Sequence, residues 1–316
     1  MRHEIEIAFT VALALIAGGL AALHGAALVV PTADGAAFVG VHYVVPALAA
    51  VIWGACLTRG ATARTWVSAV VAITCYVVVM WFHFNIKLWA PFINPVEHDL
   101  FYRQTDDAIR PVVDAALALR AALARVVPGI DDVYMHGFIA LFYVSFCIHA
   151  LRSPEHFRKV FLAALFFQGL GALAYLVTPC VGPFVFEPGV NALASAAQSA
   201  MIEARGQILT IPPSELDTRA GGVLFSGLAA MPSLHAGGAF LFVWFAARWE
   251  RFLLIAYVPI FLFILVEAVA SRWHYVIDLP IGIALAALSI DLAFRLDRPR
   301  RPQPRAVLAE PASEPA

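Results

Sequence analysis

The segment that decides the fold is residues 251–278, which read RFLLIAYVPIFLFILVEAVASRWHYVID. Residues 251–270 form an almost uninterrupted apolar run, and about 20 apolar residues let a helix cross the core of a bilayer. Glu267 is the one acidic residue of that run, and residues 271–278 carry an arginine, a histidine and an aspartate. The segment therefore predicts a transmembrane helix that ends in an ionisable stretch.

The composition of the whole chain agrees with this prediction. Of the 316 residues, 61% are hydrophobic and 14% are charged, and the mean hydropathy is +0.80. A typical soluble domain is about 45–50% apolar and about 25% charged. The composition excludes a disordered chain, a nucleic-acid-binding protein and a typical cytosolic enzyme, and it favours a polytopic helical membrane protein.

Apolar runs of similar length recur along the chain. We expect an all-α, polytopic transmembrane helical bundle of about eight spans. The sixth run is short, and its ends are the least sharply defined. The expected spans are residues 7–30, 37–57, 66–89, 132–150, 159–178, 233–248, 251–270 and 275–295.

Two long segments lie between the spans. Residues 90–131 turn amphipathic from Arg110 to Arg125, with Pro111 in the first turn and Pro128-Gly129 as the stop. This pattern predicts a helix that lies on the membrane surface. Residues 179–232 are rich in Pro, Gly and Ser, and we expect a loop there that is functional or disordered.

The distribution of Lys and Arg predicts the orientation. With the N-terminus inside, thirteen of the 21 fall on inner segments and eight on outer ones, and six of those eight lie in the two long segments. Cytoplasmic loops carry the excess of basic residues. We expect both termini in the cytoplasm, in the cell (inner) membrane of a bacterium, because the high Ala and Arg content is typical of GC-rich bacteria.

Two short motifs carry the chemistry. One is residues 231–237, MPSLHAG, and the other is residues 271–278, SRWHYVID; each stands at the start of an apolar run. Two spans separate His235 from His274, so the chain returns to the same face of the membrane. The orientation above makes that face extracytoplasmic.

The second motif suits a nucleophile. His274 and Asp278 are four residues apart and would lie on one helical face. The carboxylate can accept one ring N–H of His274, which fixes the tautomer and leaves the other nitrogen free to attack. His235 could protonate a leaving oxygen. Together these groups suggest phosphoryl transfer through a phosphohistidine.

Other groups near the motifs suit an anion. Ser233 and the free N–H groups at the helix start can hold one, and Arg272 could add a bidentate phosphate contact. Each motif taken alone is more often structural, but ionisable residues at membrane depth default to function. Glu267, seven residues before His274, either approaches this site or pairs with an arginine.

These residues resemble the type 2 phosphatidic acid phosphatase superfamily. Pro232-Ser233-Leu234-His235 is similar to its Pro-Ser-Gly-His motif, with Leu for Gly. His274 and Asp278 are similar to the end of its Ser-Arg-x5-His-x3-Asp motif. Within the superfamily, the His-Tyr-x-x-Asp of residues 274–278 and the segment 175–183 resemble the inositol phosphorylceramide synthase and sphingomyelin synthase branch.

The resemblance covers roughly residues 155–290. It implies a six-helix core, here with two extra spans, and metal-independent chemistry without a cofactor. It also implies that His274 is the nucleophile, Asp278 its orienting partner and His235 the acid.

The basic residues depart from the phosphatase pattern. The phosphatases carry an arginine six residues before the nucleophile, where this chain has Ala268, and Arg272 is only two residues before it. Arg103 and Arg110-Pro111 fit the Lys-x6-Arg-Pro spacing of the phosphatases with Arg for Lys. We predict phosphate binding by Ser233, Arg272, Arg110 and Arg103; the alternative is that Arg103 and Arg110 belong only to the surface helix.

The expected function is a membrane lipid phosphotransferase. Its donor would be a lipid phosphate or phospholipid, and its acceptor a lipid alcohol or water. Hydrolysis of a phosphatidate or polyprenyl phosphate is the alternative, and a non-catalytic lipid transporter is a remote one. The expected organisation is N-terminal transmembrane helices in 1–90, an extracytoplasmic segment in 91–131, a catalytic transmembrane domain in 132–295 and a disordered, basic, Pro-rich cytoplasmic tail in 296–316.

Overall fold

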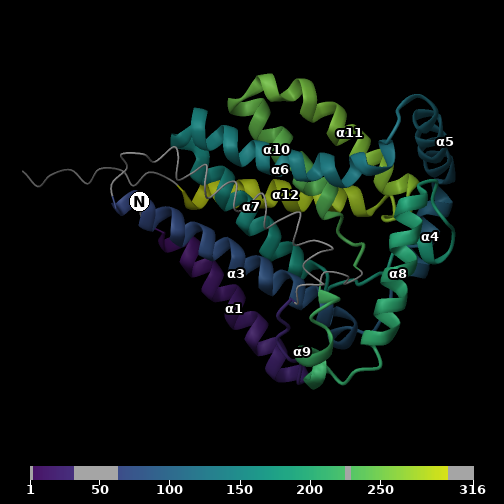
Figure 1. The fold of residues 1–316 in the computed structure, drawn as a ribbon, viewed down its shortest axis with the longest axis horizontal. Coiled ribbons are helices and arrows are strands. Elements are labelled where there is room, and N and C mark those ends of the chain that lie inside the picture. Colours follow the sequence, from purple (N-terminus) through teal and green to yellow (C-terminus); the bar gives the residue numbers. More distant parts are fainter. Residues whose placement is uncertain (1–2, 32–62, 225–228, 298–316) are drawn as a thin grey trace, which may run out of the picture.

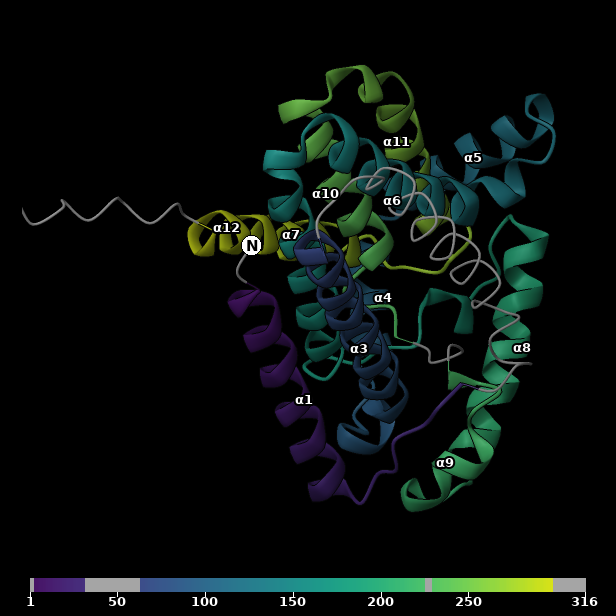
Figure 2. The same ribbon diagram turned by 60° about the vertical axis from the view of Figure 1, so that its left-hand side comes forward.

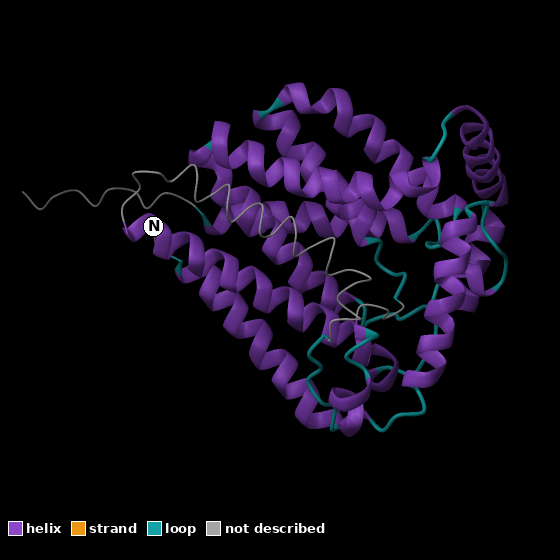
Figure 3. Ribbon diagram, in the orientation of Figure 1, coloured by secondary structure: helices purple, strands orange, loops and turns teal. Residues whose placement is uncertain are grey.

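The computed structural model describes residues 3–31, 63–224 and 229–297, and these ranges contain helices and loops without a strand (Figures 1 and 3). This confirms the all-α prediction. Short 3-10 turns join several of the helices. The α-helices are α1 (Glu4–His24), α3 (Ala63–Ile93), α4 (Asp99–Ala108), α5 (Arg110–Val126), α6 (Val133–Arg152), α7 (Pro154–Ala174), α8 (Ala192–Ile208), α9 (Leu216–Arg219), α10 (Leu234–Trp249), α11 (Leu254–Ala270) and α12 (Asp278–Leu296).

Six helical segments of the described ranges are long and apolar enough to cross a membrane. The span expected at 37–57 lies outside the described residues. The span expected at 233–248 is helix α10, but its 16 residues are fewer than the roughly 20 that a bilayer requires. The six segments are Glu4–His24, Ala69–Ile93, Ile130–Arg152, Pro154–Ala174, Arg251–Ala270 and Asp278–Leu296.

Helix α10 lies in the middle of the bundle and contacts α6, α7, α11 and α12. Its closest neighbour is α12, because glycines remove the side chains between them. A Cβ on Gly237 would overlap the carbonyl oxygen of Gly282, and a Cβ on Gly282 would overlap that of Ser233. The Ser233 N–H also donates to the Asp278 carbonyl oxygen at 3.1 Å. The backbone contact thus holds the two sequence motifs side by side.

One end of the bundle holds both described ends of the chain. Arg158 donates to Glu6 near the start of α1 (2.9 Å) and to Asp297 just after α12 (2.5 Å). Figure 1 shows the N-terminus and the end of α12 on one side, with α4, α5 and α8 at the opposite side. Both described ends of the chain therefore lie on one side of the bundle, away from α4, α5 and α8 (Figure 1).

The N-terminal helices pack onto the rest of the bundle. Helix α1 lies along α3, and both contact α7. Val79 and Ile86 of α3 share one buried apolar cluster with Leu165 of α7. The N-terminal helices therefore share an apolar core with α7.

The polar segments are more helical than the sequence indicated. Helix α5 matches the expected helix, and Gly129 after it adopts the left-handed conformation (φ 70°). Helix α4 was not expected, and α8 lies inside the segment 179–232 that was expected to be a loop. Figures 1 and 2 show α8 along one edge of the molecule. It forms because residues 192–208 are rich in Ala, a strong helix former, and because Asn191 caps the Ala194 N–H at 3.0 Å.

Candidate active site

His274 and Asp278 lie in contact where α11 returns to α12. The His274 Nδ1 atom is 3.3 Å from Asp278 Oδ2, and the same oxygen accepts the Tyr275 N–H at 2.9 Å. Both side chains are buried. The carboxylate therefore engages Nδ1 and leaves Nε2 as the second ring nitrogen available for chemistry.

The local backbone differs from the expected one. The pair was expected on one face of a helix that begins at Tyr275, but α12 begins at Asp278 and His274 lies in the preceding loop. The loop closes tightly: the Asp278 N–H donates to the Tyr275 carbonyl oxygen, and the His274 N–H to that of Ala268, both at 3.0 Å. These turns bring the two side chains together without a helix between them.

His235 lies beside this pair. Its ring centroid is 6.4 Å from that of His274, and the rings of Tyr134 and Phe138 lie 4.9 and 4.7 Å from it. His235 stands in the first turn of α10, and Ser233, which is fully buried, caps that helix through the Ala236 N–H at 3.4 Å. The structure thus brings both histidines and Ser233 to one end of the bundle.

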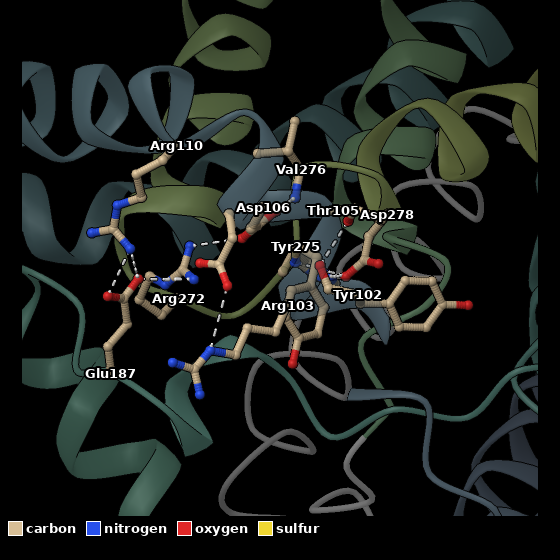
Figure 4. A network of polar contacts seen from close by, with 12 residues as sticks. Tyr102, Arg103, Thr105, Asp106, Arg110, Glu187, Arg272, Tyr275, Val276 and Asp278 are labelled. Atoms are coloured by element: carbon tan, nitrogen blue, oxygen red, sulfur yellow. Dashed lines mark hydrogen bonds and ion pairs between the residues drawn. The ribbon is translucent and has the colours of Figure 1, made fainter. Parts of the chain in front are cut away.

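Arg272 points away from solvent and is already paired. Its guanidinium donates to Asp106 at 3.1 Å and lies 2.9 Å from Glu187 (Figure 4). Its backbone is left-handed (φ 58°), which is uncommon for a residue other than glycine. Its carbonyl oxygen accepts the Phe184 N–H at 3.1 Å. The neighbouring acidic side chains and loop hold this conformation.

The other two arginines predicted to bind phosphate also have acidic neighbours. Arg110 contacts Glu187 at 3.0 Å and Asp114 at 2.7 Å (Figure 4), and the hydrogen bond that its guanidinium donates to Glu187 raises the pKa of Arg110. Arg103 is half exposed, 3.8 Å from Asp107, and lies over the Phe186 ring. Arg110 and Arg272 therefore both contact Glu187, whereas Arg103 is half exposed and does not contact it.

Two acidic residues of α4 bind the loop between α11 and α12, residues 271–277, which we call the site loop, and the sequence did not single them out for this role. Asp106 accepts the Val276 N–H at 2.9 Å in addition to Arg272. Asp99 accepts the Tyr275 hydroxyl at 2.8 Å and the Gly182 N–H at 2.9 Å. Asp99 and Asp106 are seven residues apart, which places them on one face of α4. That spacing was the signal that could have found them.

Glu267 pairs with an arginine, which was one of its two expected roles. Its carboxylate is fully buried and contacts Arg120 of α5, and it accepts Asn191 and Ser271 side chains at 2.7 Å each. Arg120 also contacts Asp131. Helix α5 is therefore not only a surface helix, because its Arg120 side chain is fully buried and pairs with Glu267 of α11.

The described residues hold no group of three His, Cys, Asp or Glu side chains that could bind a metal ion. The polar groups at this end of the bundle are the two histidines, several acidic residues and the arginines that pair with them.

The fold and site define a polytopic helical membrane protein with two histidines and a buried aspartate at one end of the bundle. A profile of the PAP2 superfamily matches residues 109–292, which is more than half of the chain. The chain belongs to this superfamily, and membership suggests lipid phosphatase or phosphotransferase activity. No curated protein and no solved structure matches the chain. The resemblance to the synthase branch stays a prediction.

Proposed function

We propose that this protein moves the phosphate, or the phosphate-linked headgroup, of a membrane lipid through a phosphohistidine on His274. One observation carries the proposal: Asp278 engages Nδ1 of His274 while the ring of a second histidine, His235, lies 6.4 Å away. A nucleophile with its orienting carboxylate and a separate acid are the parts that such a transfer needs.

In the first half of the reaction, Nε2 of His274 attacks phosphorus and forms the N–P bond. The P–O bond to the leaving lipid oxygen breaks, and His235 supplies the proton that this oxygen takes up. Asp278 stabilises the positive charge that develops on the ring of His274. General acid catalysis of this kind contributes roughly 10²- to 10⁴-fold to a rate.

In the second half, an acceptor hydroxyl attacks phosphorus and gives its proton to His235. The N–P bond breaks, and its electron pair returns to Nε2 of His274. A lipid alcohol as acceptor gives a new phospholipid, and water gives free phosphate. We favour the lipid alcohol, because the motifs around His235 and His274 resemble the synthase branch; superfamily membership alone supports hydrolysis equally.

The site would face the outside of the cell membrane. The bias of Lys and Arg supports a cytoplasmic location for both termini. Arg158 ties the start of α1 and the end of α12 to one end of the bundle. The site lies at the other end. The lipid would therefore be processed in the outer leaflet.

The test uses purified protein in detergent with EDTA. Phosphatidate and phosphatidylinositol serve as donors, with and without ceramide or diacylglycerol, and phosphate release and new phospholipid are measured together. New lipid that requires the acceptor establishes the transferase, whereas free phosphate without new lipid establishes the phosphatase.

The control variants are His274→Ala and His156→Ala. The His156 ring stacks on Trp249, and Trp249 ends α10 opposite the end that carries His235, so its loss should leave activity unchanged. Activity that survives in His274→Ala, or that EDTA abolishes, would overturn the phosphohistidine mechanism. A lipid transporter would tolerate His274→Ala.

A further inference from the structure

Lys87 of α3 is a cation at the site that the sequence motifs do not include. Its ammonium lies 5.3 Å from the centre of the Tyr175 ring, and that ring belongs to one buried cluster with Tyr134 and with Leu234, the residue before His235. Within residues 3–31, 63–224 and 229–297, no carboxylate forms an ion pair with it. Lys87 also precedes residues 109–292, so the superfamily match assigns it nothing.

The arginines near the site differ from Lys87 in this respect. Arg272 is paired with Asp106 and Glu187, and Arg110 shares Glu187. A phosphate that approached either arginine would have to displace a carboxylate that already satisfies it. Among the described residues, Lys87 lies over the face of the Tyr175 ring and pairs with no carboxylate, so an anion can add to that contact without displacing an acid.

Tyr134 of α6 supplies a second unsatisfied group. Its side chain is 93% buried, its hydroxyl has no hydrogen-bond partner in the described part of the chain, and its ring lies 4.9 Å from that of His235. Tyr134 and Tyr175 belong to the same buried apolar cluster, and Tyr175 is the ring that Lys87 covers. Tyr175 therefore lies between the element that carries the unpaired hydroxyl and the element that carries the ammonium. A buried donor without a partner costs free energy unless a ligand supplies an acceptor.

We propose that Lys87 and the Tyr134 hydroxyl bind the non-bridging oxygens of the lipid phosphoryl group beside His235. The ammonium offsets the charge that the group carries, and the hydroxyl donates a hydrogen bond that the ligand-free protein leaves unmade. The inference rests on the proposed function, since it names the anion subsite of the same centre. It also gives α3 a part in the site, in addition to its packing against α7.

Orthovanadate and inorganic phosphate are the probes, and their binding is measured by the shift of the melting temperature and by inhibition. Lys87→Met should weaken orthovanadate inhibition by roughly 10²- to 10³-fold, and Lys87→Arg should retain most of it. Tyr134→Phe should weaken it by roughly 10- to 100-fold. The KM for the lipid phosphate should rise in the same order.

Melting temperatures with and without orthovanadate distinguish a role of Tyr134 in binding from a role in stability. Because the Tyr134 hydroxyl has no partner, Tyr134→Phe should not lower the melting temperature of the ligand-free protein, yet it should lose the shift caused by orthovanadate. Tyr257→Phe is the matched control: it removes a hydroxyl that contacts the Ser145 hydroxyl at 2.9 Å, so it should lower the melting temperature and keep the shift. Lys159→Met, which removes a lysine paired with Asp297, should also keep the shift.

Failure of this inference is distinguishable from failure of the proposed function. If the wild-type protein turns over lipid phosphates but Lys87→Met and Tyr134→Phe keep the orthovanadate affinity, the anion subsite is wrong and the function stands. If no lipid is turned over but orthovanadate binds and either variant loses it, the subsite stands. If Lys87→Met does not fold, the isosteric Tyr134→Phe decides. A wild-type protein that binds neither probe overturns the inference.

Discussion

At the scale of single residues, the centre of the site is a histidine held by one oxygen of a buried carboxylate. Asp278 Oδ2 receives both the His274 ring and the Tyr275 N–H, while Oδ1 has no hydrogen-bond partner among the described residues. The ring is thus oriented through a single oxygen. Removing the negative charge while keeping the shape of the side chain tests whether orientation and charge both contribute.

Asp278→Asn should lower kcat by roughly 10²- to 10⁴-fold, because the amide can still touch Nδ1 but does not stabilise the charged ring. KM should change little. Asp291→Asn, which removes an exposed partner of Arg295, is the matched control and should be as active as wild type. Steady-state kinetics on the preferred lipid phosphate measure both. A loss as complete as that of His274→Ala would mean that Asp278 does more than orient.

The buried carboxyl of Asp106 makes the stability of the protein depend on pH. Burial raises the pKa of its carboxyl above the ordinary 3.8, although the Val276 N–H and Arg272 act in the opposite direction. A group with a raised pKa binds its proton more tightly in the folded than in the unfolded protein. Its contribution to stability is therefore complete below pH 3.8 and is lost as the pH rises through the raised pKa.

Asp106→Asn removes this titration. The melting temperature of wild type minus that of Asp106→Asn should therefore fall as the pH rises from about 4 to 7. Melting curves of both proteins in the same detergent give the difference at each pH. A difference that does not change with pH would show that the Asp106 carboxyl titrates alike in the folded and unfolded chains.

The sequence predicted His235, His274 and Asp278 at this scale because their spacing is local or follows from a simple return across the membrane. It did not predict Asp99, which reaches the site loop only after α4 folds against it. Arg272, Arg110 and Arg103 were predicted as phosphate ligands, and the fold adds carboxylates from distant segments beside Arg272 and Arg110, which the sequence did not predict. Their binding of phosphate stays a prediction.

At the scale of helices, two packing features place the motifs. The glycines of α10 and α12 let the two backbones touch, and the Arg120–Glu267 pair ties α5 to the end of α11. The apolar runs predicted most of these helices, because length and hydrophobicity decide a span. Helix α4 was missed because it has only ten residues and is polar, and α8 was missed because it lies in a segment whose many Pro, Gly and Ser residues indicate a loop.

Gly282→Ala should cost about 1–3 kcal/mol of stability, the usual range for overpacking, because the added methyl group overlaps the Ser233 carbonyl oxygen. Activity should fall with it, since Asp278 and Ser233 are held across this contact. Gly18→Ala in α1 is the matched control, because a Cβ there meets nothing within 4 Å. Thermal melts and activity assays of both variants give the comparison, and equal behaviour would disprove the role of the contact.

Arg120→Met should destabilise the protein by about 3–5 kcal/mol, because it leaves the buried Glu267 carboxylate uncompensated. The double variant Arg120→Met/Glu267→Gln should recover a large part of that loss, since the unpaired charge is gone. Melting curves of the wild type, both single variants and the double variant form a thermodynamic cycle. Additive losses would mean that the two side chains do not act as a pair.

At the scale of the whole molecule, the described chain is a bundle with its two ends on one side and its site on the other. The alternation of spans predicts this arrangement, and the ion pairs of Arg158 with Glu6 and Asp297 agree with it for the described residues. The proposed role of α3, phosphate binding by Lys87, was not predictable from the sequence. Nothing local in residues 63–93 distinguishes Lys87 from an ordinary residue at the end of a span.

The proposed orientation predicts opposite labelling of two exposed positions. In a cysteine-free background, Val126→Cys at the end of α5 should react with an impermeant maleimide added outside intact cells. Phe252→Cys, between α10 and α11, should react only after the membrane is opened. The reverse pattern would place the site in the cytoplasm.

The position of Asp278 at the start of the last helix has a consequence for biosynthesis. A ribosome delivers the chain from its N-terminus, so His235 and His274 leave it before Asp278, and Asp297 leaves last of all the described residues. Until α12 inserts, neither the His274–Asp278 pair nor the ion pair between Arg158 and Asp297 can form. A nascent chain therefore carries an unassembled centre until α12 has been synthesised, and the centre can form only once this helix is inserted.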